Sequence, residues 1–204
     1  MRYLIGFLLI FLCPLTMAVG QENPAPSSSP KAYLFRAEIS GSAKNFNSTD
    51  RLEGDYKVVA SKDGLQVLRL IDGQEYLIGG ESADELRRML GIGQDEREYL
   101  NKDPTKKQWG AKYSYKLPMV KKTFLREAEY KIVSEGESKT TPAGTFKTVK
   151  IECDSKAVFE VGTFKQKWVY YYAPEIDSIV EWNYDSAVDQ KGAKIEIKLI
   201  GLER

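Results

Sequence analysis

Residues 65–78 read LQVLRLIDGQEYLI, and this stretch indicates a β-sheet protein. Two apolar runs flank Asp72-Gly73, and this dipeptide between such runs is a strong signal for a hairpin turn. Upstream, residues 52–60 alternate apolar and polar side chains and lead through Lys62-Asp63-Gly64 into Leu65–Ile71. The region therefore predicts consecutive antiparallel strands.

The same period of two begins at residue 31, so one more strand precedes this block. One face of that strand would carry Tyr33, Phe35, Ala37 and Ile39, and the other Leu34, Arg36, Glu38 and Ser40. Together with Leu52–Ala60, Leu65–Ile71 and Gln74–Ile78, it gives four predicted antiparallel strands.

Strand patterns resume at Trp109 and continue to the last residues. Thr141-Pro142-Ala143-Gly144 places Pro and Gly where they reverse a chain. The predicted strands around and after this turn are 127–137, 145–154, 157–161, 164–172, 178–184 and 193–202. Short links favour an antiparallel meander over parallel crossovers, so the sequence predicts a mainly β protein of about ten strands.

One helical stretch interrupts the strands. Ser82-Ala83-Asp84-Glu85 has the form of a capping box, and Leu86, Met89 and Leu90 follow at helical spacing. The sequence predicts one short helical insertion at roughly 82–102.

The N-terminal residues have the three-part layout of a cleavable signal peptide. Arg2 precedes an apolar core of about 11 residues, which is shorter than the ~20 needed to span a bilayer, and small residues precede a cut after Gly20. A cut after Ala18 is the other option. Cys13 lies inside the apolar core, which argues against lipidation. We therefore expect residues 1–20 to be a signal peptide, 21–30 a flexible Pro/Ser linker and 31–204 one β-rich domain.

Composition excludes several classes of function. Without residues 1–20 the basic and acidic residues balance, so nothing attracts nucleic acid or an anionic membrane. Cys153 is then the only cysteine, and it alternates with Val149 and Ile151 as a buried thiol would. The chain has no histidine, which removes the usual nucleophile systems and imidazole metal ligands. We expect no enzyme activity, no metal and no cofactor.

The densest chemical feature is aromatic. Trp168, Tyr170 and Tyr172 point one way from their strand, and Trp182 and Tyr184 share a face of the next. If the strands are neighbours, these five rings line one surface of the sheet. They form either a packed core, which is common for aromatic residues in strands, or a ligand-binding wall.

Seven lysines between residues 102 and 122 are the other cluster, and either an anionic ligand or a solvated sheet edge accounts for them. They are Lys102, Lys106, Lys107, Lys112, Lys116, Lys121 and Lys122. Carboxylates are abundant, but nothing in the sequence selects a catalytic pair.

Two segments resemble a group of exported bacterial β-proteins of unknown function. These are residues 141–151, TPAGTFKTVKI, and residues 168–181, which contain Tyr171-Tyr172-Ala173-Pro174. Trp109 fits the same pattern, whereas Asp177-Ser178 stands where the group often has glycine. The resemblance implies a curved antiparallel sheet, comparable to the half-barrel of the lipoprotein carriers LolA and LolB. It implies no site residues.

These observations predict a non-enzymatic envelope protein that binds an apolar or amphipathic ligand in a curved sheet. We expect it to be exported to the periplasm or cell exterior of a bacterium. The five rings are the expected ligand-binding residues. Two alternatives stay open: a protein-interaction module with the rings as core and an envelope protein as partner, and polysaccharide binding by aromatic stacking. No nucleic-acid partner and no stable membrane anchor are expected.

Overall fold

The computed structural model describes residues 30–40, 53–61, 64–79, 105–116, 123–159, 162–185 and 194–204. The predicted signal peptide, the linker up to Ser29 and the predicted helical insertion at 82–102 lie outside these residues. In the described part of the chain, the one helix is the 3-10 turn η2 (Pro174–Ile176), so no described helix could cross a membrane.

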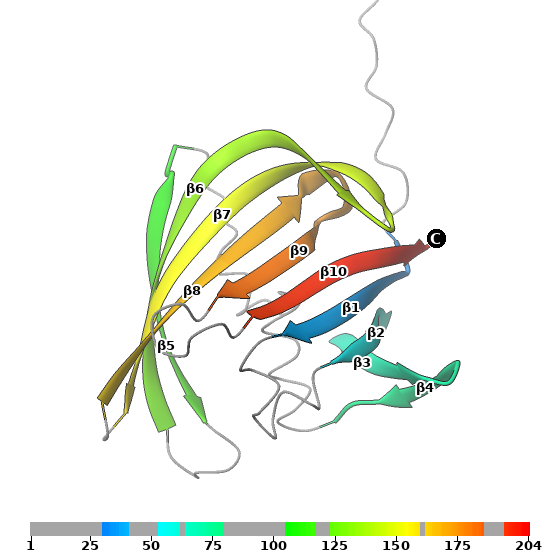
Figure 1. The fold of residues 1–204 in the computed structure, drawn as a ribbon, viewed down its shortest axis with the longest axis horizontal. Coiled ribbons are helices and arrows are strands. Elements are labelled where there is room, and N and C mark those ends of the chain that lie inside the picture. Colours follow the sequence, from blue (N-terminus) through cyan, green and yellow to red (C-terminus); the bar gives the residue numbers. More distant parts are fainter. Residues whose placement is uncertain are drawn as a thin grey trace, which may run out of the picture.

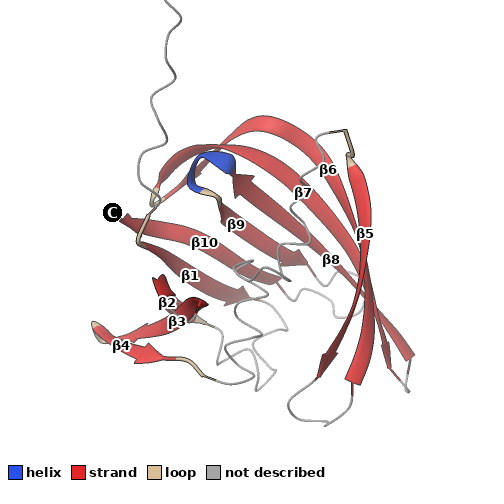
Figure 2. Cartoon of the chain, turned by 180° about the vertical axis from the view of Figure 1, so that it is seen from behind, coloured by secondary structure: helices blue, strands red, loops and turns tan. Residues whose placement is uncertain are grey.

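Ten strands form one open antiparallel sheet, in the order β4-β3-β2-β1-β10-β9-β8-β7-β6-β5. Figures 1 and 2 show that the sheet curves, with β2–β4 on one side of the central strands and β5 and β6 on the other. The predicted mainly β fold with a single curved sheet of about ten strands is confirmed. The strands are β1 (Ala32–Ser40), β2 (Gly54–Ser61), β3 (Gly64–Ile71), β4 (Gln74–Leu77), β5 (Gln108–Lys116), β6 (Thr123–Thr141), β7 (Gly144–Phe159), β8 (Gly162–Ala173), β9 (Ser178–Asp185) and β10 (Lys194–Glu203).

The sheet consists of two meanders joined through the ends of the chain. Strands β1 to β4 form one meander and β5 to β10 the other, and β1 pairs with β10 between them. A simple meander would have paired β4 with β5, but these strands are the two opposite edges of the sheet. The prediction of a meander is therefore right within each half and wrong at the junction, because a pairing between the first and last strands leaves no local signal.

The Asp72-Gly73 hairpin is confirmed. Asp72 and Gly73 have φ values of 51° and 77°, and both central residues of a type I′ turn require positive φ. The turn allows Ile71 to pair with Gln74, and the register continues to Leu68 opposite Leu77.

The β6–β7 hairpin is longer than the sequence predicts. Residues 145–154 and 157–161 were predicted as separate strands, but β7 runs unbroken from Gly144 to Phe159. Ser155 keeps the alternation between Cys153 and Ala157, and all three are buried, so no turn interrupts the strand. Two register shifts in β6, at Ile132/Ser134 and Glu135/Glu137, bend this hairpin. Figure 1 shows it arching beyond the neighbouring strands.

One face of the sheet carries a continuous apolar surface, which we call the aromatic face. Successive cross-strand partners on it run Ile39, Ile195, Tyr184, Trp168, Cys153, Tyr130 and Trp109, from β1 to β5. A parallel row runs Ala37, Ile197, Trp182, Tyr170, Ile151 and Ile132. Because side chains alternate between the two faces of a strand, these rows lie on the same face. The face that a single-layer sheet buries is the one toward which it curves, so the rows form its inner lining.

The pairing of β1 with β10 depends on residues such as Leu199, which is fully buried opposite Phe35. We predict that Leu199→Ala lowers the free energy of unfolding by about 3 kcal/mol, because it leaves a cavity at the junction of the two meanders. Ile200→Ala is the control, since Ile200 is only half-buried beside it. Chemical denaturation measures both variants, and an equal loss in the two would contradict the assigned junction.

Candidate functional site

The structure brings four of the five predicted rings together. Trp168 lies opposite Tyr184, and Tyr170 lies opposite Trp182, in neighbouring strands β8 and β9. Trp168, Tyr170 and Trp182 are 7%, 6% and 3% exposed, whereas Tyr184 is half-buried. Their common face is as predicted, and most of this ring surface is part of the core.

Tyr172 lies on the same face of β8, beyond these two pairs and opposite Val149 of β7. A register shift between Tyr171 and Tyr172 places Tyr172 opposite Ile179, with Val180 as the extra residue. The Tyr172 hydroxyl donates a hydrogen bond to Asp177 Oδ1 at 2.8 Å. Asp177 has φ 48° after η2, a left-handed conformation that glycine adopts more readily. Tyr172 therefore supports this turn at the end of the aromatic face.

Two aromatic residues extend the face beyond the predicted set. The Trp109 and Tyr130 rings stack with centroids 5.5 Å apart, and Tyr130 lies 6.4 Å from the Tyr170 ring. Alternation within Glu127–Glu137 marks Tyr130 as apolar-facing. Its register against β7 and β5 does not follow from the sequence. All three tryptophans of the chain thus belong to one face.

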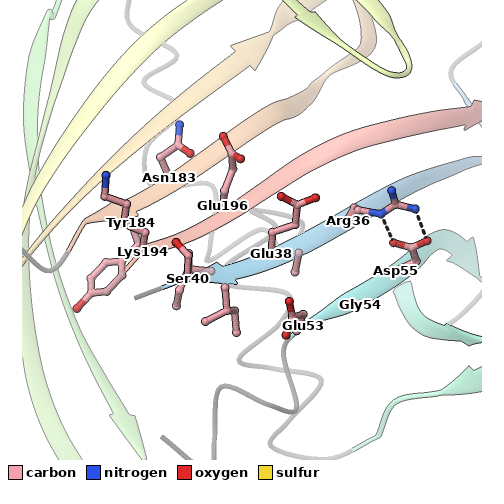
Figure 3. A pocket seen from close by; sticks show the side chains of 13 residues that line it. Arg36, Glu38, Ser40, Glu53, Gly54, Asp55, Asn183, Tyr184, Lys194 and Glu196 are labelled. Atoms are coloured by element: carbon pink, nitrogen blue, oxygen red, sulfur yellow. Dashed lines mark hydrogen bonds and ion pairs between the residues drawn. The ribbon is translucent and has the colours of Figure 1, made fainter. Parts of the chain in front are cut away.

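A hollow of about 770 Å³ lies where the aromatic face meets the ends of β1, β9 and β10. Its apolar lining includes Ile39, Ile195 and Tyr184, which are the first members of the long row. Figure 3 shows Glu38, Glu196 and Asn183 on one side of the sheet there and Tyr184 pointing to the other. The hollow thus has apolar lining from the aromatic face and polar lining, which we call its rim, that includes side chains of the opposite face.

The rim of the hollow is mostly acidic. Its acidic members are Glu38, Glu53, Asp55 and Glu196, against Arg36 and Lys194. Arg36 donates two hydrogen bonds to Asp55, at 2.7 and 2.8 Å, and these lower the pKa of the Asp55 carboxyl. Glu38 lies directly opposite Glu196, a like-charge pairing that Lys198 Nζ relieves at 2.9 Å from Glu196.

Buried polar atoms on the aromatic face without a hydrogen-bond partner in the described residues include the Trp182 indole nitrogen Nε1 and the Ser155 hydroxyl Oγ. Such atoms are rare in folded proteins, because a buried donor or acceptor without a partner costs the desolvation of that group. The aromatic face therefore offers unused hydrogen-bonding capacity as well as apolar surface.

The opposite face carries a buried ion pair that holds the long hairpin. Lys139 Nζ on β6 lies 2.7 Å from Glu181 Oε1 on β9, and its ammonium lies 3.9 Å from the Tyr171 ring centroid. Asn183 donates to the same Glu181 oxygen at 2.7 Å. The Glu181 side chain is 4% exposed, so this contact pins the bent end of β6 against β9.

The lysine-rich stretch is partly explained by the sheet. Strand β5 is an edge of the sheet. Lys107, just before β5, pairs with Glu135 of β6, and Lys112, within β5, pairs with Glu127 of β6. Of the other lysines, Lys102, Lys121 and Lys122 lie outside the described residues. An edge with paired lysines agrees with the solvated-edge interpretation.

In the described residues, the thiol is buried and the acidic side chains form no metal-binding group. Cys153 is fully buried, as predicted, between Tyr130 and Trp168 in the long row. No cluster of acidic or cysteine side chains in the described ranges has the grouping of a metal site.

Comparisons with known proteins give structural likeness only. No protein-family profile and no curated protein matches the chain. A candidate exported protein with a YmcC-like fold from Bacteroides fragilis is 14% identical, with 88% of this chain and 98% of that chain covered and a TM-score of 0.39. A candidate lipoprotein from Parabacteroides distasonis is 14% identical, with 87% and 97% covered and a TM-score of 0.48. The hypothetical lipoprotein YmcC from Escherichia coli is 7% identical, with 84% of each chain covered and a TM-score of 0.45. No residue role is transferred from these proteins.

The Lys139–Glu181 pair generates a stability prediction. We expect Lys139→Ala to lower the free energy of unfolding by about 2–3 kcal/mol, because it leaves the Glu181 carboxylate buried without its cation. Lys139→Met combined with Glu181→Leu should recover most of that loss. Lys107→Ala, which breaks the exposed pair with Glu135, is the control and should change little. If chemical denaturation showed equal losses for the two lysine substitutions, the stabilising role of the Lys139–Glu181 pair would be refuted.

Glu127 provides a test by pH. Hydrogen bonds from Lys112 Nζ at 2.7 Å and Lys156 Nζ at 2.6 Å hold the pKa of the Glu127 carboxyl at about 2. Because this pKa is lowered on folding, the pair stabilises the sheet above the ordinary carboxyl range and is lost as pH falls toward 2. An NMR titration should find this midpoint, and Lys156→Gln should raise it. A midpoint near 4.5 in the unsubstituted protein would be inconsistent with the contact.

Proposed function

We propose that this protein is a non-enzymatic, exported protein of the bacterial envelope that binds an apolar or amphipathic ligand on its aromatic face. The aromatic face is continuous with the hollow at the ends of β1, β9 and β10, and this continuity is the main support for ligand binding. Tyr184 belongs to both, since it is paired with Trp168 and also lines the hollow. A ligand that enters the hollow would thus meet the aromatic rows directly.

The chemistry of the hollow suits a molecule with an apolar part. Ile39, Ile195 and Tyr184 offer apolar area, and small-molecule sites commonly combine such area with a few polar groups. The buried indole N–H of Trp182, which lacks a partner in the described structure, would serve as a fixed hydrogen-bond donor to a ligand oxygen. Burial of Trp168, Tyr170 and Trp182 implies that contact begins at Tyr184, the more exposed ring.

Two further observations support a non-enzymatic, exported protein. The chain has no histidine, so imidazole acid–base and nucleophile chemistry is absent. Residues 1–20 have the layout of an export signal, and the similar structures are described as exported or as lipoproteins. Placement in the periplasm or at the cell exterior follows from export.

A protein-interaction module is the second candidate, and the β4 edge favours it. Strand β4 is exposed along its whole length at an open edge, where Tyr76 is 49% and Leu77 63% exposed. Together with Ile71 at 44%, these side chains would suit an added strand from an envelope partner. Polysaccharide stacking has less support, because stacking requires open ring faces and three of the five rings are buried.

Purification of the mature protein from its own host tests the proposal. Native mass spectrometry and lipid extraction should reveal a copurifying apolar or amphipathic molecule. Tyr184→Ala should reduce its occupancy, because this side chain joins the hollow to the rings, whereas Tyr76→Ala at the β4 edge should not. A protein that carries no such ligand, but that crosslinks at Tyr76 to one reproducible envelope protein, would favour the interaction module.

A further inference from the structure

The aromatic face contains one polar corner, formed by Arg126 on β6, Ser155 on β7 and Gln166 on β8. Ser155 lies opposite Ala128 on one side and Gln166 on the other, and Arg126 lies opposite the buried Ala157. Alternation along each strand puts the three side chains on the face that carries Cys153 and Trp168. The corner therefore adjoins the long aromatic row.

Arg126 is fixed by contacts that reach across a strand. Its Nη2 donates to Gln166 Oε1 at 2.6 Å, and its guanidinium carbon lies 4.7 Å from the Trp168 ring centroid. Both partners belong to β8, so the side chain crosses β7 at the level of Ser155. A planar guanidinium stacked on an aromatic ring keeps its N–H groups in a fixed fork that matches carboxylate and phosphate oxygens.

Ser155 is the second, independent indication of a ligand. The residue is 5% exposed, and its hydroxyl has no hydrogen-bond partner in the described part of the chain. A buried hydroxyl group lowers the stability of the fold unless it has a hydrogen-bond partner. An oxygen atom of a ligand held at Arg126 would supply that partner.

We propose that this corner binds the anionic head group of an amphipathic ligand, a carboxylate or a phosphate, whose apolar chain lies along Trp168 and Tyr184. This inference rests on the proposed function and adds the charge and position of the head group. The hollow at the other end of the row has fewer basic than acidic lining residues, and its Arg36 is already paired with Asp55, so it offers an anion little positive charge. Trp168 and Ile195 are two strand spacings apart, about 10 Å, so an apolar chain can span the row from the corner to the hollow.

A comparison of amphiphiles with the same chain tests the head group. Dodecanoate, dodecyl phosphate and dodecanol are titrated into the mature protein by isothermal calorimetry. We expect one or both anions to bind at least about 10-fold more tightly than the neutral alcohol, since charge-assisted hydrogen bonds are the stronger kind. The stronger anion identifies carboxylate or phosphate as the preferred group.

Variants locate the site. Arg126→Gln should weaken anion binding by about 10-fold or more and leave dodecanol binding unchanged, and Arg126→Lys should restore part of it. Ser155→Ala should weaken anion binding while the thermal midpoint stays the same or rises. A purely structural Ser155 would not change affinity. Lys167→Gln removes one positive charge from the opposite face of β8 and is the matched control.

The outcomes separate this inference from the proposed function. If dodecanol binds as tightly as the anions, or if Arg126→Gln and Lys167→Gln behave alike, the anionic site is refuted while apolar binding stands. If none of the three amphiphiles binds, the proposed function itself is contradicted. The comparison of anions with alcohol on the unsubstituted protein decides the question even if an Arg126 variant fails to fold.

Discussion

A single-layer β-sheet can bury an apolar face only by curving around it or by receiving a cover, and the rest of this structure follows from that constraint. Seven strands contribute one residue each to the row from Ile39 to Trp109. Removing this row from water stabilises the sheet, because apolar burial is the dominant favourable contribution to folding. An inner face of this kind is both a core and a prospective binding wall, and the two roles differ only in what fills the remaining space.

The central pair β1 and β10 lies between the two halves of the curved sheet. It joins the two meanders, so neither half presents an open edge at the middle of the sheet. This pairing is expected to slow folding. It links the first described strand to the last, so a long loop must close before the contact can stabilise the sheet. On the outer face, Lys139 and Glu181 hold the bent β6–β7 hairpin in place.

Local patterns predicted most of the strands, while the contacts between distant segments could not be read from them. The Asp72-Gly73 turn requires positive φ, and the sequence supplies residues that tolerate it, so this hairpin was predictable. The neighbouring positions of Trp168 and Tyr184 followed from the short link between their strands. The β1–β10 pairing was not predictable, since any two amphipathic strands share the same alternation.

Register shifts and charged side chains on the inner face limited the prediction of the site. The extra residue Val180 places Ile179 opposite Tyr172, and a bulge of this kind leaves no trace in an apolar pattern. On β7 the buried positions change from Phe146 and Thr148 to Ile151 and Cys153, which moves burial from one face to the other. Arg126 resembles a solvated strand residue in the sequence. Only the pairing of β6, β7 and β8 places it over Trp168.

Fluorescence quenching shows whether an apolar chain contacts the aromatic face. All three tryptophans of the chain lie on that face, so their emission reports on it alone. A fatty acid brominated at the middle of its chain quenches tryptophan on contact. If the chain contacts this face, quenching is saturable and the unbrominated fatty acid of equal length competes it away. Emission that the brominated acid lowers no more than the unbrominated one would contradict this contact.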